Sequence, residues 1–236
     1  IGFTQGFSIR ISQRFGAEDY QGLRKTAAMS ILLTAAVAVV FTILSLSLSR
    51  PVLILLDTPA NVFDNALLYL RIIFAGIPII LGYNVLSAFL RALGDSRTPL
   101  VAMIIAACIN TALDLLFVMV FHWGVAGAAI ATVFAQFCSC VFCFFAVRRI
   151  SFFRMEKSDW QLDWRNIWDL IKLGSPTAFQ NGVIGVGGLA VQYVINGYGF
   201  LFVAGFTATN KLYGLLEIAA SSFGYSMTTY VGQNLG

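Results

Sequence analysis

The chain has 236 residues, of which 58% are hydrophobic and 11% charged, and its formal net charge is +4 at pH 7. Soluble domains carry about 25% charged residues, and a soluble core of this size cannot hide so many apolar side chains, which excludes an ordinary soluble domain. Runs free of charge repeatedly reach the ~20 residues that a bilayer-spanning helix needs. The composition therefore predicts an all-α polytopic membrane protein.

About seven helices are predicted in chain order, the first of them only a helix end. They cover residues 1–14, 23–48, 65–90, 98–121, 124–147, 167–195 and 201–233. Pro78 lies well inside its span and Pro176 one turn into another, and both predict a kink because proline removes a backbone hydrogen bond. Small residues three and four apart in 124–131 predict close contact with a neighbouring helix.

The basic residues predict orientation rather than a ligand. Twelve of the fifteen Lys and Arg residues lie in 10–25, 91–97 and 148–172. These clusters alternate with connections that are nearly free of basic residues, which is the positive-inside pattern and places the clusters in the cytoplasm. We therefore expect no binding of nucleic acid.

The longest charged segment predicts a division of the chain. Residues 148–166 mix basic and acidic residues with Trp160 and Trp164, and Trp168 follows. Such a mixture is typical of an anchor at the lipid headgroups. We expect an N-terminal lobe in 1–150, a cytoplasmic linker in 151–166 that is partly a surface-lying amphipathic helix, and the start of a C-terminal lobe in 167–236.

The two ends of the chain resemble each other. Each closes an apolar helix with a glutamine three residues before a glycine, Gln13 with Gly16 and Gln233 with Gly236. The offset of 220 residues fits a repeat of six helices. Because the sequence also begins without Met, we expect it to be part of a longer protein.

Residue patterns typical of an enzyme or a metal site are not found. Cys108, Cys138, Cys140 and Cys143 lie in apolar spans without a nearby His or carboxylate, which favours small buried side chains over a metal site. His122, the one histidine, stands at a connection outside any zinc motif. An intramembrane enzyme is therefore disfavoured, and we expect no cofactor besides a coupling ion.

Two carboxylates inside apolar stretches, Asp114 and Glu217, are the main functional candidates. An ionised carboxylate in a span costs about 2.5–3.5 kcal/mol on insertion scales, so it indicates a substrate site, an ion pathway or a structural hydrogen bond. Asn110 lies one turn from Asp114, and an intrahelical contact between them is geometrically easy. Asp114 is also about 12 Å of helix from the connection at His122, so a structural or vestibule role is at least as well supported as a coupling role.

Glu217 lies about 24 Å from either end of its predicted helix. Tyr213 precedes it by one turn on the same face and can donate a hydrogen bond to its carboxyl group. A carboxyl group at such depth is suited to exchange a proton, or to attract a cation when ionised. We therefore expect Glu217 to bind an ion or a cationic substrate.

A series of ordered motifs identifies a family. They are Leu90-Arg-Ala-Leu-Gly-Asp-Ser-Arg-Thr-Pro99, Asn110-Thr-Ala-Leu-Asp114, Gly124-Val-Ala-Gly-Ala-Ala-Ile-Ala-Thr132, Gln136, Gly174-Ser-Pro-Thr-Ala-Phe-Gln180 and Val231-Gly-Gln-Asn-Leu-Gly236. Together with Gln13-x-x-Gly16-Ala17 they run the whole length of the chain. The sequence resembles the multidrug and toxic compound extrusion family of transporters.

The resemblance implies twelve helices in two lobes of six that face each other across a central cavity. This chain would hold the end of helix 2 through helix 8. It also implies an antiporter of the inner or plasma membrane that exports drug-like, amphiphilic or cationic compounds by alternating access, driven by protons or sodium. We expect Gln180, Asn181, Gln192, Tyr213 and Glu217 to line the cavity, with Asn110 and Asp114 as further candidates, and we expect a monomer in the lipid bilayer.

Two departures from the family leave the coupling ion open. The family's first-helix acid would fall before Ile1, and 167–195 has no acid beyond Asp169, where some members carry one. A lipid-linked saccharide flippase of related architecture is the nearest alternative. It should display several cationic residues in its cavity, for which Lys211 alone is weak support.

Overall fold

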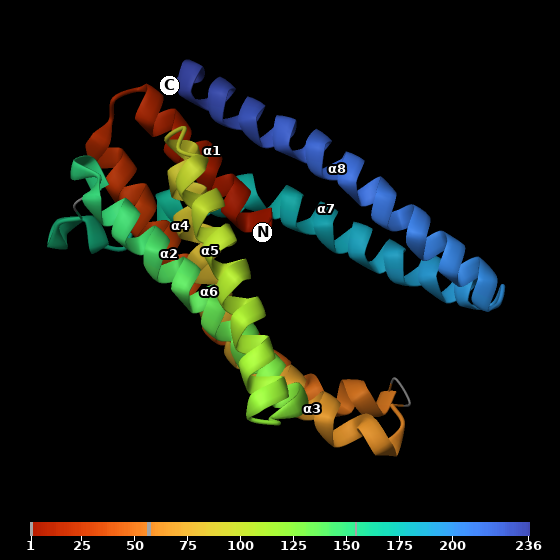
Figure 1. Cartoon of the computed structure of the whole chain (residues 1–236). Coiled ribbons are helices and arrows are strands. Elements are labelled where there is room, and N and C mark those ends of the chain that lie inside the picture. The colour runs from red at the N-terminus through yellow and green to blue at the C-terminus, as the bar shows by residue number, and fades with distance from the viewer. Residues whose placement is uncertain (1, 56–57, 154) are drawn as a thin grey trace.

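The computed structural model describes the backbone of residues 2–55, 58–153 and 155–236, and every element in these ranges is helical. Figure 1 shows their arrangement. The elements are α1 (Gly2–Gly16), α2 (Tyr20–Leu55), α3 (Ala60–Ala75), α4 (Ile77–Ala92), α5 (Arg97–Asp114), the π-helical turn η1 (Leu115–Val120), α6 (Gly124–Arg149), the 3-10 turns η2 (Ser151–Phe153) and η3 (Lys157–Trp160), α7 (Trp164–Asn196) and α8 (Phe200–Leu235).

Each of the seven predicted helices has a helical counterpart, one of them as a broken pair, and four helices of the described residues are long and apolar enough to cross a membrane. These are α2, α5 with η1, α6 and α7, and the bent pair α3–α4 is a fifth if it counts as one span. The α8 helix is not in this set, because Asn210, Lys211 and Glu217 interrupt its apolar residues. The chain is thus a multi-pass membrane protein.

The predicted span 65–90 begins earlier and is broken. It starts at Ala60, and α3 meets α4 at Gly76 with a bend of 41°. Pro78 lies in the first turn of α4, where its missing N–H leaves no hydrogen bond unmade. Pro176 lies inside α7, which continues as one helix through it, so the predicted break is found at the start of α4 and not at Pro176.

The predicted amphipathic helix in the linker is wrong. Apart from residue 154, which lies outside the described residues, the segment forms two short 3-10 turns. Phe153 is buried and stacks on Phe89 of α4 at 5.6 Å between ring centroids. The carboxylate of Asp159 is 2% exposed and pairs with Arg24 of α2 at 3.2 Å. These contacts fix the linker against the bundle and prevent it from lying on a membrane surface as a helix.

The α4 helix is the centre of the bundle, because it packs against α1, α2 and α6. Its side chains Val85, Phe89 and Leu90 are buried together with Phe7 of α1 and Leu23 of α2. The α5 helix lies on the outside and packs along α6. Figure 1 shows that these helices form one body from which α7 and α8 diverge as a long hairpin.

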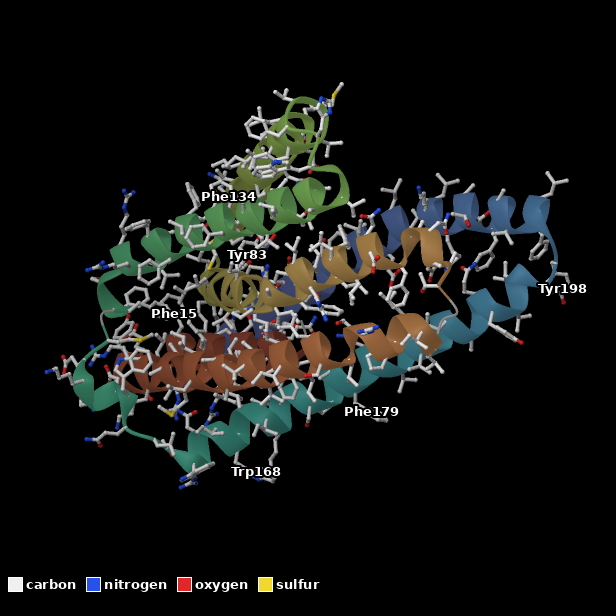
Figure 2. The ribbon with its side chains drawn as sticks, turned by 90° about the horizontal axis from the view of Figure 1, so that it is seen from below. Phe15, Tyr83, Phe134, Trp168, Phe179 and Tyr198 are labelled. Carbon is white, nitrogen blue, oxygen red and sulfur yellow. The ribbon has the colours of Figure 1, made fainter. Side chains whose placement is uncertain are left out.

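The hairpin is joined to the bundle through α1. A Cβ atom on Gly6 would lie 2.5 Å from the backbone nitrogen of Gly174, and one on Gly2 would lie 2.5 Å from the Cα of Ala178. Backbones in such contact leave no room for a side chain. Farther along α7, Phe179 is 75% exposed and points away from the bundle (Figure 2).

The contact between α1 and α8 confirms the offset seen in the sequence. Ser12 lies against Gly232, and Gln5 donates a hydrogen bond of 2.8 Å to the hydroxyl of Tyr225. In both pairs the partners are 220 residues apart, so the two helices run parallel where they touch, as expected of a local two-fold axis between repeats. The reciprocal pairs agree, since Gly16 meets Gln233 while Gly236 meets Gln13.

The connection from α4 to α5 explains the Gly-Asp pair of the motif at 90–99. Gly94 has φ of +88°, a conformation that favours glycine. Asp95 then accepts hydrogen bonds from the backbone N–H of Thr98 at 3.0 Å and from its hydroxyl at 2.6 Å. Burial raises the pKa of Asp95, but the Thr98 bonds and the charge of Arg97 outweigh it, so the pKa lies below its usual value of 3.8.

We expect Gly6→Leu to destabilise the full-length protein that carries this sequence by about 1–3 kcal/mol, since overpacking must separate α1 from α7. Thermal unfolding in detergent measures the loss. The control is Ala36→Leu, which adds a side chain to an exposed position of α2. Equal unfolding temperatures for the two variants would show that α1 and α7 do not pack through their backbones.

We expect Asp95→Ala to lower stability by about 1 kcal/mol at pH 7, the usual cost of losing a helix cap. The lowered pKa means that the carboxylate stabilises the fold above pH 3.8, and that this stabilisation is lost as the pH falls through the native pKa. The unfolding temperatures of the variant and the unaltered protein should therefore converge below pH 3.8. Asp64→Ala, on the exposed surface of α3, is the control; a gap that stays constant with pH would contradict the assignment.

Candidate functional site

Asp114 stands where α5 changes from an α-helix to a π-helical turn. The Oδ1 atom of its carboxyl group is buried and has no hydrogen-bond partner among the described residues. The turn widens after Asp114, so that the N–H of Phe121 bonds to the carbonyl of Leu116, five residues before it. Turns of this kind occur frequently at functional sites. A buried carboxyl oxygen without a partner is costly and calls for a proton or a ligand.

The predicted contact between Asn110 and Asp114 does not form. Asn110 instead donates to the hydroxyl of Thr132 on α6, at 3.5 Å, and that hydroxyl donates to the carbonyl of Ala128 at 2.9 Å. The helices approach closely here, since a Cβ atom on Gly127 would lie 2.8 Å from Phe117. Thr132 therefore provides the partner for Asn110, and Asp114 keeps an oxygen unpaired.

We call Asp114, Asn110 one turn before it and the Thr132 partner of Asn110 the Asp114 cluster. They offer a carboxylate, an amide and a hydroxyl from two helices, and no hydrogen bond among the described residues joins Asp114 to the other two. Oxygen groups of these kinds suit hard cations, and a carboxyl group at membrane depth also suits a proton. A transition-metal site has no support, because no three His, Cys, Asp or Glu residues gather in the described part of the chain.

The cysteine prediction is only partly right. Cys143 is fully buried, as expected of a small apolar side chain, whereas Cys108 is exposed. Cys108 lies on α5, which within the described residues packs extensively against α6 and η1 alone.

The predicted residues of the hairpin lie apart from the Asp114 cluster. All five are exposed: Gln180, Asn181, Gln192, Tyr213 and Glu217. The predicted hydrogen bond between Tyr213 and Glu217 is absent from the described residues, and the Tyr213 side chain is 63% exposed. In this arrangement α5 packs on α6 while α8 lies on α1, so Asp114 and Glu217 belong to separate arms of the molecule (Figure 1).

The role of Thr132 was not predicted. Its motif, 124–132, was interpreted as a packing surface, and nothing in the sequence pairs it with Asn110, 22 residues away. The sequence did contain a clue to this contact. The predicted helices ending at 121 and starting at 124 are joined by a very short connection, which favours an antiparallel pair. Counting back from the connection, Asn110 and Thr132 then stand at similar depths.

Comparison with known proteins gives consistent matches. The MatE family model matches residues 1–116. The "Probable multidrug resistance protein YpnP" of Bacillus subtilis is 35% identical over 241 residues, which cover all of this chain and 53% of that protein. The "Probable multidrug resistance protein NorM" of Thermotoga maritima is 25% identical and matches all of this chain and 52% of its own length. The chain thus spans about half the length of the curated relatives it matches.

Solved structures show the same fold. A MATE protein crystallised in the bent conformation gives a TM-score of 0.88 at 24% identity, over 99% of this chain and 54% of that one. An outward-facing MATE family transporter gives a TM-score of 0.84 at 23% identity, covering 98% of this chain and 51% of that one. An inward-facing one gives a TM-score of 0.79 at 23% identity, covering 98% of this chain and 57% of that one.

Proposed function

This chain belongs to the multidrug and toxic compound extrusion (MATE) family, and from that premise we propose that the protein carrying it is a secondary active efflux antiporter. It exports amphiphilic, often cationic compounds through the membrane by alternating access, in exchange for protons or sodium. The relatives named as multidrug resistance proteins support this choice of substrate class. The solved inward-facing and outward-facing relatives support the mode of transport.

The unpaired oxygen of Asp114 is the observation that carries the proposal. A structural carboxylate should be saturated by hydrogen bonds, but this one has an oxygen that is buried and unbonded within the described residues. Inside a membrane span such an acid is typical of an ion or substrate pathway. In our proposal Asp114 takes up the coupling ion, and Asn110 and Thr132 supply further oxygen ligands when the ion is sodium.

Glu217 has a different role in this proposal. It is exposed on α8 and makes no ion pair with the described residues, so it is free to meet a cation in a cavity between the arms. Tyr213 is exposed one turn before it, and tyrosine faces attract cations. Glu217 would therefore bind the cationic substrate, together with Gln180, Asn181 and Gln192 of α7.

The flippase alternative is weaker. Recognition of an anionic lipid-linked saccharide requires several cationic groups, and the sequence after Lys172 has only Lys211. The positive charge of Lys211 is balanced by the negative charge of Glu217, so that part of the chain has no net positive charge.

The proposal is tested with the full-length protein in sealed vesicles, by following the efflux of a fluorescent cationic dye under an imposed proton or sodium gradient. We expect Asp114→Asn to lower gradient-driven efflux at least tenfold, because the neutral amide no longer exchanges its charge with the ion. Thr132→Val should weaken coupling less, because it removes one of three ligands. We expect Glu217→Gln to raise the dye concentration needed for half-maximal efflux.

The control is Asp64→Asn, which neutralises an exposed acid of α3 outside the proposed sites. Unchanged gradient-driven efflux in Asp114→Asn would contradict the coupling role. Failure of the unaltered protein to export dye under either gradient would contradict the antiporter itself.

A further inference from the structure

A large apolar groove lies on the bundle away from the Asp114 cluster. The α2 and α6 helices pack on either side of α4 without packing extensively against each other. The space between them measures about 910 Å³ and has mostly apolar walls. Pro78, Gly82 and Leu86 form its floor on α4, and no residue of α5 lines it. The groove is therefore not part of the proposed ion site.

The length of the groove matches one leaflet of a bilayer. Its floor runs along α4 from Pro78 to Phe89, which is about 16 Å of helix. The hydrocarbon core of a bilayer is about 30 Å thick. The groove thus begins at the arginine-rich end of the bundle and stops near the middle of the membrane, as a single acyl chain does.

The end of the groove near the linker is cationic and aromatic. Arg148, in the last turn of α6, lines it there together with Trp160. Arg148 is exposed and forms no ion pair with the described residues, although Arg10, Arg14 and Arg24 each have an acidic partner. Trp160 is 42% exposed, and tryptophan with arginine is typical of the headgroup level.

We propose that this groove binds an anionic phospholipid from the arginine-rich leaflet. One acyl chain lies along α4 between α2 and α6, and the phosphate meets the guanidinium group of Arg148. The charge of Arg148 complements an anionic headgroup, and the leaflet that faces clusters of Lys and Arg is the one rich in such lipids. The small side chain of Ala35 on α2 keeps the groove open on one side. The proposal does not depend on the antiport function.

The test measures lipid binding to the full-length protein, purified in detergent and depleted of lipid, by native mass spectrometry. Phosphatidylglycerol and phosphatidylcholine with identical acyl chains are the two probes. We expect the unaltered protein to bind phosphatidylglycerol more tightly. Arg148→Gln should weaken that binding about fivefold, the usual contribution of one basic residue near an anionic lipid surface, and should leave phosphatidylcholine binding unchanged.

Two matched pairs of variants separate the headgroup from the acyl chain. Arg149→Gln, at the neighbouring exposed position outside the groove, controls for overall charge. Ala35→Phe fills the groove and should weaken both lipids, whereas Ala36→Phe adds the same ring to an exposed position beside it.

Three results would overturn the proposal. The first is equal binding of the two lipids by the unaltered protein, or binding of neither, as expected if another part of the protein fills the groove. The second is an equal loss of phosphatidylglycerol in Arg148→Gln and Arg149→Gln. The third is unchanged lipid binding in Ala35→Phe.

Discussion

The backbone contact of α1 with α7 and α8 is the constraint on which the rest of the structure depends. Gly6 lies against Gly174, and Ser12 lies against Gly232. At these points no side chain larger than that of Ser12 separates the helices, so the position of α1 fixes where the hairpin leaves the bundle. The ion pair of Arg10 with Asp169, at 3.3 Å, adds a charged contact between α1 and α7 at the same end. Beyond these contacts the hairpin diverges from the bundle, as Figure 1 shows.

This arrangement gives the two acids different surroundings. Asp114 lies between α5 and α6, so its environment is set by helices of one bundle. Glu217 lies on α8, beyond the contact with α1, and its environment depends on how far the hairpin stands from the bundle. In the proposed antiporter the ion therefore binds within one arm, whereas the substrate binds at a site whose shape changes with the distance between the arms. Glycine contacts suit such a movement, because they have no interlocking side chains to disengage.

The length and polarity of the apolar runs predicted most of the helices. The features that they did not predict depend on how the helices pack against one another. The spans follow from apolar length, and the repeat from Gln13-x-x-Gly16 and its copy at 233–236. The break at Gly76 could not be placed, because Pro78 is equally compatible with the first turn of a new helix. Asn110 bonds to Thr132 instead of Asp114 because α6 lies next to α5, which the sequence alone does not show. The surroundings of Glu217 could not be predicted, because they depend on the angle at which α8 leaves α1.

If the protein works by alternating access as proposed, the contact between α1 and α8 must separate when the arms, which diverge at the opposite end (Figure 1), come together. Spin labels in the full-length protein test it, with one pair at Ala17 and Leu235 beside that contact and a second at Trp123 and Tyr198 on the far connections. Pulsed electron resonance gives both distances with and without a coupling-ion gradient or dye. Alternating access predicts opposite changes, so that the first distance lengthens when the second shortens. Distances that stay constant, or that lengthen together, would contradict it.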